Sequence, residues 1–226
     1  MNKLGELIRL ADRAGKVKPG GKRQSPCEDC GQMHGGATYI CVRCVDDHRK
    51  RLRVKAQRRM VDTIPAAYRE CRFGAARMGC VAENYRQSVA ASKARGLTIT
   101  GHAGVGKTTL AVAKLFQLFD EGARSCLFVS ACDLARARAV HPLGVGEAPL
   151  VSSAMQAGVV VIDDLGKEKQ DIAGAVSDVI FARHAKGLRT IVTAGFGVEA
   201  ARTKYDDGIA RRLFEEDWVI VGGKQK

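Results

Sequence analysis

The stretch "GHAGVGKTT", residues 101–109, lies between the apolar segment "LTIT" (97–100) and a run with helical character. It fits the pattern G-x-x-x-x-G-K-[ST], and a preceding strand and a following helix are the context that this pattern requires. Glycines let the backbone turn tightly, so that N–H groups and the positive end of the helix converge on phosphate oxygens. The stretch therefore predicts an ATP site, with contacts from Gly101, Gly104, Val105, Gly106, Lys107, Thr108 and Thr109. We expect Lys107 to reach the β- and γ-phosphates and the Thr108 hydroxyl to bind Mg²⁺.

The second half of such a site is an acidic residue at the end of a buried strand. "GVVVIDDLG" (158–166) supplies two acids directly after four apolar residues. We expect Asp163 to hold Mg²⁺ through its water shell and Asp164 to orient or deprotonate the attacking water. A simple turn after the strand is the competing interpretation of the two acids.

Short apolar segments recur outward from this motif. They are "LTIT" (97–100), "CLFV" (126–129), "VVVI" (159–162), "TIVT" (190–193) and "WVIV" (218–221). Because fully apolar strands that alternate with helices are typical of buried parallel sheets, the pattern predicts an α/β fold with helices on both faces.

Composition limits the classes of partner and compartment. The 226 residues carry a formal net charge of +13 and are 46% hydrophobic. Such a charge favours a nucleic acid or an acidic protein surface as partner, although a generally basic proteome would produce it too. We expect a cytoplasmic protein without a membrane partner, because we find neither a secretory signal nor an apolar run of about 20 residues.

Four of the eight cysteines form a spaced pattern, Cys-x₂-Cys-x₁₀-Cys-x₂-Cys. Cys27, Cys30, Cys41 and Cys44 would each give one thiolate to a closed tetrahedral site, for which Zn²⁺ is the expected structural ion and an Fe–S cluster the alternative. The glycine-rich "MHGGATY" (33–39) predicts a hairpin turn between the two pairs. So short a module has too small an apolar core to fold alone, so metal binding would supply its folding free energy.

The sequence divides into four parts. Residues 1–23 predict an amphipathic helix and a flexible linker, residues 24–48 the zinc module, residues 49–63 a basic linker helix and residues 64–226 the ATPase domain. The linker helix is rich in basic residues and contains no acid between positions 49 and 59. It is either a solvated connection or a contact for phosphates.

From residue 64 onward the chain resembles the AAA+ ATPases of the bacterial helicase-loader group, which includes the DnaC and DnaI proteins and the related transposition helper IstB. The resemblance rests on the order of five segments: "IPAAYRECRF" (64–73), "GHAGVGKTTLA" (101–111), "VVVIDDLG" (159–166), "GLRTIVTAGF" (187–196) and "IARRLFE" (209–215). It implies an AAA+ fold without a full lid domain, ATPase activity and self-assembly through sites shared between subunits. It further implies that Arg212, with Arg211 as second choice, enters the site of a neighbouring subunit.

The resemblance also implies partners, namely a hexameric replicative helicase, held by the N-terminal module, and single-stranded DNA. The arginine-rich segment with Arg136 and Arg138 falls where relatives contact DNA. Two departures from the family bear on hydrolysis. Gly195 stands where an Asn usually positions the lytic water, a role that Thr193 or Ser130 could take in part, and Asp164 replaces the usual Glu.

These expectations combine into an ATP-dependent helicase loader acting in DNA replication. Two alternatives stay open: an IstB-like transposition helper, and a nucleotide-locked module that binds DNA or a protein with little turnover. A small-molecule kinase is disfavoured, because we find neither an arginine-rich lid nor a second pocket signature.

Overall fold

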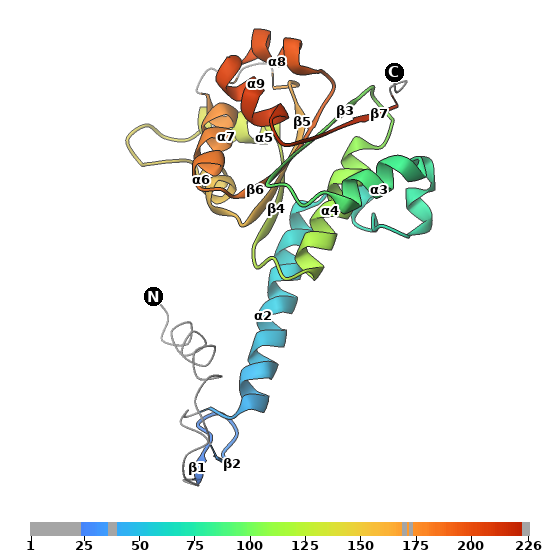
Figure 1. The fold of residues 1–226 in the computed structure, drawn as a ribbon. Coiled ribbons are helices and arrows are strands. Elements are labelled where there is room, and N and C mark those ends of the chain that lie inside the picture. Colours follow the sequence, from blue (N-terminus) through green and yellow to red (C-terminus); the bar gives the residue numbers. More distant parts are fainter. Residues whose placement is uncertain (1–23, 36–39, 169–170, 172–173, 223–226) are drawn as a thin grey trace. The chain divides into compact units, whose positions relative to one another are not determined.

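The computed structural model describes residues 24–35, 40–168, 171 and 174–222 (Figure 1). The chain divides into two compact units, Met1–Lys55 and Ala56–Lys226. The predicted helix and linker of residues 1–23 lie outside the described residues. Within the described part, no helix combines the length and the apolar character that crossing a membrane requires.

The first unit holds a small hairpin and the start of a long helix. Strands β1 (Gln24–Pro26) and β2 (Met33–Gly35) pair antiparallel, with Ser25 opposite His34. The hairpin turn is formed by residues 27–32, where Gly31 has a φ of 69° and its N–H donates to the Cys27 carbonyl at 2.8 Å. The prediction of a turn over residues 33–39 was therefore wrong at its start, since Met33–Gly35 forms a strand.

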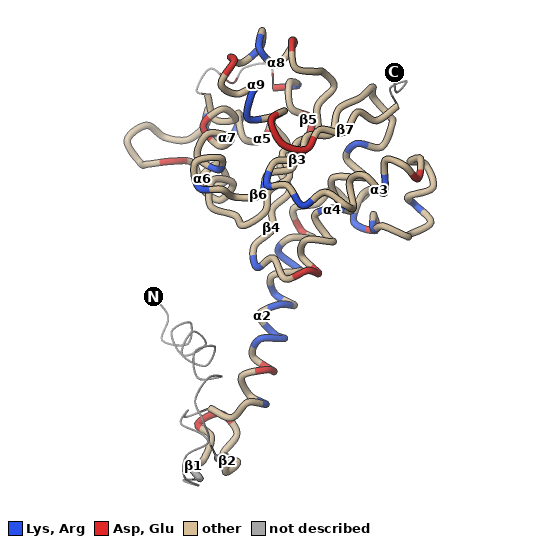
Figure 2. Tube along the Cα trace, in the orientation of Figure 1, with Lys and Arg blue, Asp and Glu red and all other residues tan. Residues whose placement is uncertain are grey.

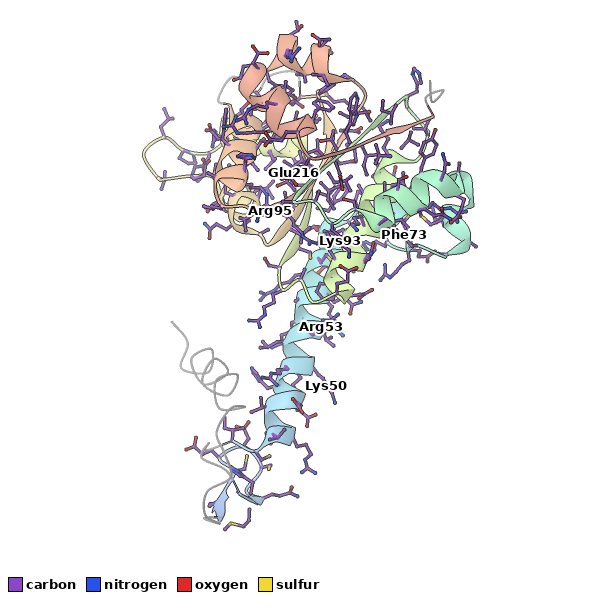
Figure 3. The ribbon with its side chains drawn as sticks, viewed as in Figure 1. Lys50, Arg53, Phe73, Lys93, Arg95 and Glu216 are labelled. Carbon is purple, nitrogen blue, oxygen red and sulfur yellow. The ribbon has the colours of Figure 1, made fainter. Side chains whose placement is uncertain are left out.

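Helix α2 (Val42–Thr63) begins earlier than the predicted linker helix of residues 49–63. Its first turn includes Cys44, so the helix begins inside the predicted zinc module. Basic residues recur along the helix (Figure 2), and the side chains of Lys50 and Arg53 project from it (Figure 3). Near its end, Met60 is fully buried in the core of the second unit.

The second unit is built on a five-stranded parallel sheet in the order β4-β5-β6-β3-β7. The strands are β3 (Gly96–Gly101), β4 (Cys126–Ser130), β5 (Val159–Leu165), β6 (Arg189–Ala194) and β7 (Asp217–Val221). All five predicted strands are confirmed. Their central residues are buried because helices cover both faces of the sheet (Figure 1).

Each face of the sheet has its own apolar core. On one face lie the end of α2, two short 3-10 helices (Ala66–Tyr68 and Ala76–Cys80), α3 (Glu83–Ala91) and α4 (Lys107–Asp120). On the other lie α5 (Ala131–Ala139), α6 (Pro149–Gln156), α7 (Ala175–Ala185), α8 (Val198–Lys204) and α9 (Asp207–Phe214). The parallel strands all end at one edge of the sheet, and that edge carries the predicted phosphate loop and both acids.

Candidate functional site

The predicted phosphate loop joins β3 to α4 and depends on glycine at several points. Gly101, Gly104 and Gly106 have φ values of 147°, 82° and 89°, a region that other residues rarely enter. A Cβ on Gly101 would lie 2.2 Å from the Val221 carbonyl oxygen, and one on Gly106 would lie 2.4 Å from a methyl group of Val81. The end of β7 and the segment before α3 therefore enclose the loop.

Lys107 begins α4 and turns its side chain back over the loop. Its ammonium group donates to the carbonyl oxygens of Gly101 at 2.9 Å and His102 at 2.7 Å. Only 9% of the residue is exposed, and this burial lowers the pKa of the ammonium group. Val105 packs against the core and Thr109 is buried in α4. A phosphate that enters this loop would replace these two carbonyl oxygens as the partner of the Lys107 ammonium group.

Thr108 and Asp163 are brought together from positions 55 residues apart. The Thr108 hydroxyl lies 2.9 and 3.2 Å from the two carboxylate oxygens of Asp163. Burial raises the pKa of Asp163, while hydrogen bonds from Thr193 and Thr108 oppose that shift. Two oxygen ligands that meet beside a phosphate loop fit the preference of Mg²⁺ for hard oxygen donors.

Thr193 is the residue that organises both acids. Its hydroxyl donates to Asp163 Oδ1 at 2.6 Å and accepts the backbone N–H of Asp164 at 2.9 Å. Ser130, the other side chain named as a substitute for the missing Asn, instead caps α5 through Asp133. Thr193 therefore fixes the acids, although it is not placed as a free side chain that could hold water.

Asp164 has an unusual backbone and an ion pair that the sequence did not indicate. Its φ of 57° is the only positive value at a non-glycine residue among the described residues. Asp tolerates this left-handed conformation better than most residues. Its carboxylate accepts from the Lys167 ammonium group at 2.8 Å, which raises the pKa of Lys167. Nothing lies within 4 Å of a Cβ built on Gly195, so the position of the missing Asn is open space.

Arg212 lies away from the other candidate residues. Its guanidinium group donates to the Gly208 carbonyl at 2.7 Å and stacks 4.4 Å above the Phe181 ring centre. Together with Gly96 and Leu97 at the start of β3, it lines a cavity of about 160 Å³, whereas the phosphate loop follows the end of β3. Arg212 therefore does not complete the site of its own chain. Its neighbour Arg211 pairs with Glu215 at 3.0 Å.

The four predicted cysteine ligands meet in the first unit. Their sulfur atoms all lie within 4.8 Å of one another, and those of Cys30 and Cys41 are 3.8 Å apart. Tetrahedral zinc with Zn–S bonds of about 2.3 Å places its sulfurs about 3.8 Å apart. The Cys41 backbone N–H donates to the Cys27 sulfur at 3.3 Å and lowers the pKa of that thiol to about 6. The residues fit a closed structural Zn²⁺ site, in which Cys44 would be the fourth ligand.

Of the two arginines considered for DNA, Arg138 is engaged within the chain. It donates to Glu147 and to Asp178 and is 16% exposed. Arg136 remains 73% exposed and lies 3.5 Å from Asp133. A phosphate would have to displace two carboxylates from Arg138, so Arg136 is the better placed of the two.

Comparison with known proteins supports the fold. No protein-family model and no curated protein matches the sequence. A crystal structure of the DnaC helicase loader is similar, with 25% identity, a TM-score of 0.51 and coverage of 61% of this chain and 86% of that chain. A candidate primosome component from Streptococcus pyogenes serotype M3 is 17% identical, with a TM-score of 0.54 and coverage of 73% and 92%. The chain has the AAA+ P-loop fold. The predicted fold class is thereby confirmed.

Proposed function

We propose that the chain is an ATPase that binds Mg²⁺-ATP at the loop of residues 101–109. The observation that carries the proposal is the direct contact of Thr108 with Asp163, in a fold shared with a DnaC helicase loader. Lys107 and the loop amides would hold the phosphates, while Thr108 and Asp163 would hold Mg²⁺, which neutralises charge on the transferring group. Asp164 would orient the attacking water once its carboxylate is released from Lys167.

The site is proposed to be completed by Arg212 from a second copy of the chain. The support is that Arg212 lines a cavity beside the start of β3, whereas the phosphate loop of the same chain follows the end of β3. A guanidinium group at the transferring phosphoryl group stabilises the spreading charge and is typically worth about 10³-fold or more in rate. Self-assembly and hydrolysis would then depend on each other.

We further propose that this ATPase loads a hexameric replicative helicase onto single-stranded DNA. The similarity to the DnaC loader supports the role, and the net charge of +13 supports a polyanionic partner. Exposed basic residues of α2, among them Lys50 and Arg53, are candidates for DNA phosphates. The four-cysteine module would hold Zn²⁺ and serve as the adaptor to the helicase rather than as a catalyst.

The test combines binding and turnover. The purified chain is mixed at low salt with the host's hexameric helicase and, separately, with a transposase, and ATP hydrolysis is measured with and without single-stranded DNA. We expect capture of the helicase and DNA-stimulated hydrolysis that is abolished by Lys107→Ala and by Arg212→Ala. Arg124→Ala, an exposed arginine in the turn before β4, is the matched control. Capture of the transposase alone would replace the loader with an IstB-like helper.

A second candidate function is a nucleotide-locked module that binds its partners with little turnover. Two observations favour it. Gly195 has no side chain that could position the attacking water, and the Asp164 carboxylate is paired with Lys167. ATP binding by calorimetry, together with no hydrolysis in the presence of both partners, would select this candidate.

A further inference from the structure

The buried carboxylate of Glu168 has no part in the proposed chemistry. The residue is 4% exposed and lies four positions after Asp164. Glu168 accepts from the Tyr205 hydroxyl through Oε1 and from the Gly166 backbone N–H through Oε2 at 2.9 Å. Its Oε1 also lies 3.2 Å from the Lys204 ammonium group. Removing any one of the three partners of this buried carboxylate would cost free energy of folding.

One side of this cluster holds the turn that follows the acids. Gly166 is bonded at both backbone groups, since its N–H donates to Glu168 and its carbonyl accepts from Lys204 at 2.6 Å. The Lys167 N–H donates to the Asp164 carbonyl at 3.1 Å, which closes the turn on the other side. The Phe196 ring covers Gly166, where a Cβ would lie 2.3 Å from the ring. The left-handed conformation of Asp164 is therefore maintained by a fixed support.

The other side of the cluster holds the junction of α8 and α9. Lys204 is the last residue of α8, and Tyr205 follows it directly. Asp206 then caps α9 by accepting the Ile209 N–H at 2.6 Å, and α8 packs against α9. Arg212 lies on α9, so its position depends on the same junction. Burial and the nearby Glu168 raise the pKa of Tyr205, so its hydroxyl stays protonated and can donate.

We propose that Glu168, with Tyr205 and Lys204, is a positioning residue that couples the Asp163–Asp164 turn to the helix carrying Arg212. The inference rests on the proposed function, because it assigns Arg212 to the neighbouring site. A change at the acids of one site would thereby move the arginine that the same chain presents to the next site. Gly195 cannot report on the nucleotide through a side chain, and the Glu168 cluster supplies another physical route between the two ends of the sheet.

The test distinguishes two roles of one chain. It donates Arg212 to the ATP site of a neighbour, and it hydrolyses ATP in its own site. Donor chains carry Asp164→Asn, which is expected to remove their own turnover, while Asn tolerates the left-handed backbone. Because this change lies at the acids themselves, the donor with Asp164→Asn alone is the reference for every other donor. They are mixed in excess with wild-type chains, and ATP hydrolysis per wild-type chain is measured. Donors that also carry Tyr205→Phe are expected to lower this rate by roughly fivefold or more, the usual size of coupling between sites. Tyr68→Phe, a partly exposed tyrosine before α3, is the matched control donor.

Three further measurements make the outcome decisive. The Tyr205→Phe donor should bind ATP with unchanged affinity by calorimetry, which a general folding defect would not allow. Glu168→Gln combined with Tyr205→Phe should cost less than the sum of the two single changes, because both act on one hydrogen-bonded cluster. A Tyr205→Phe donor equal to the Tyr68→Phe donor overturns the inference. If donors with Arg212→Ala also support full hydrolysis, the proposed trans arginine is what fails.

Discussion

Thr193→Val removes a hydroxyl that both acids of the site need. Thr193 is fully buried, and valine has nearly the same shape, so the change introduces no cavity. It deletes the bond to the Asp163 carboxylate and leaves the Asp164 N–H without its acceptor. A bond to a charged group contributes about 1.5–3 kcal/mol and an unsatisfied buried donor costs about 1–3 kcal/mol. Because such terms overlap, we expect a loss of about 2–4 kcal/mol of unfolding free energy.

The assay is chemical denaturation at neutral pH, with Thr193→Ser as the control. Serine keeps the hydroxyl and loses only a methyl group, worth about 1 kcal/mol. Calorimetry should also show weaker Mg²⁺-dependent ATP binding for Thr193→Val, because Asp163 loses a bond that favours its ionised form. If valine destabilises the protein no more than serine does, the assignment of Thr193 as the support of the acids is refuted.

Three other predictions follow from the same geometry. Gly195→Asn should fold normally and raise ATP hydrolysis by about tenfold or more, because the position is open and an amide there could hold the attacking water. An unchanged rate in a steady-state assay would show that Gly195 does not limit turnover. Gly106→Ala should abolish ATP binding in calorimetry, since its Cβ would meet Val81 and its backbone is left-handed; retained affinity would contradict the description of the loop. Asp163→Asn should raise the thermal stability of the ATP-free protein while removing its stabilisation by Mg²⁺-ATP. The sign follows from the raised pKa of Asp163: the stability of the folded protein falls as pH rises through that pKa and the buried carboxylate ionises, and Asn cannot ionise. A lower melting temperature for Asp163→Asn would contradict this prediction.

The strands and the phosphate loop could be predicted because their signals are local. Each strand is a short apolar run, and the loop needs glycine at fixed spacing. The proximity of Thr108 and Asp163 could also be predicted, because the phosphate loop follows β3, Asp163 lies near the end of β5, and parallel strands end at the same edge of a sheet. The four cysteines were predicted from spacing alone, and their sulfurs do converge.

What the sequence did not indicate depends on contacts between distant segments. Glu168 and Tyr205 are 37 residues apart, and neither belongs to a motif. The sequence does not indicate that Arg138 pairs with Glu147 and Asp178. The predicted turn of residues 33–39 was wrong at Met33–Gly35, which forms β2, and the turn of that hairpin is instead closed by backbone bonds of Cys27 within residues 27–32. The contacts of Glu168 and Arg138 follow from tertiary packing, which residue patterns do not encode.

The pairing of β3 with β7 has a consequence for how the protein is made. Leu97 lies opposite Asp217, so the strand before the phosphate loop gains one of its two neighbours only after 120 further residues have been added. The Val221 carbonyl that borders Gly101 arrives later still. A ribosome-bound chain therefore cannot close this loop until β7 has emerged, and the unpaired edge of β3 must be shielded meanwhile from other nascent chains.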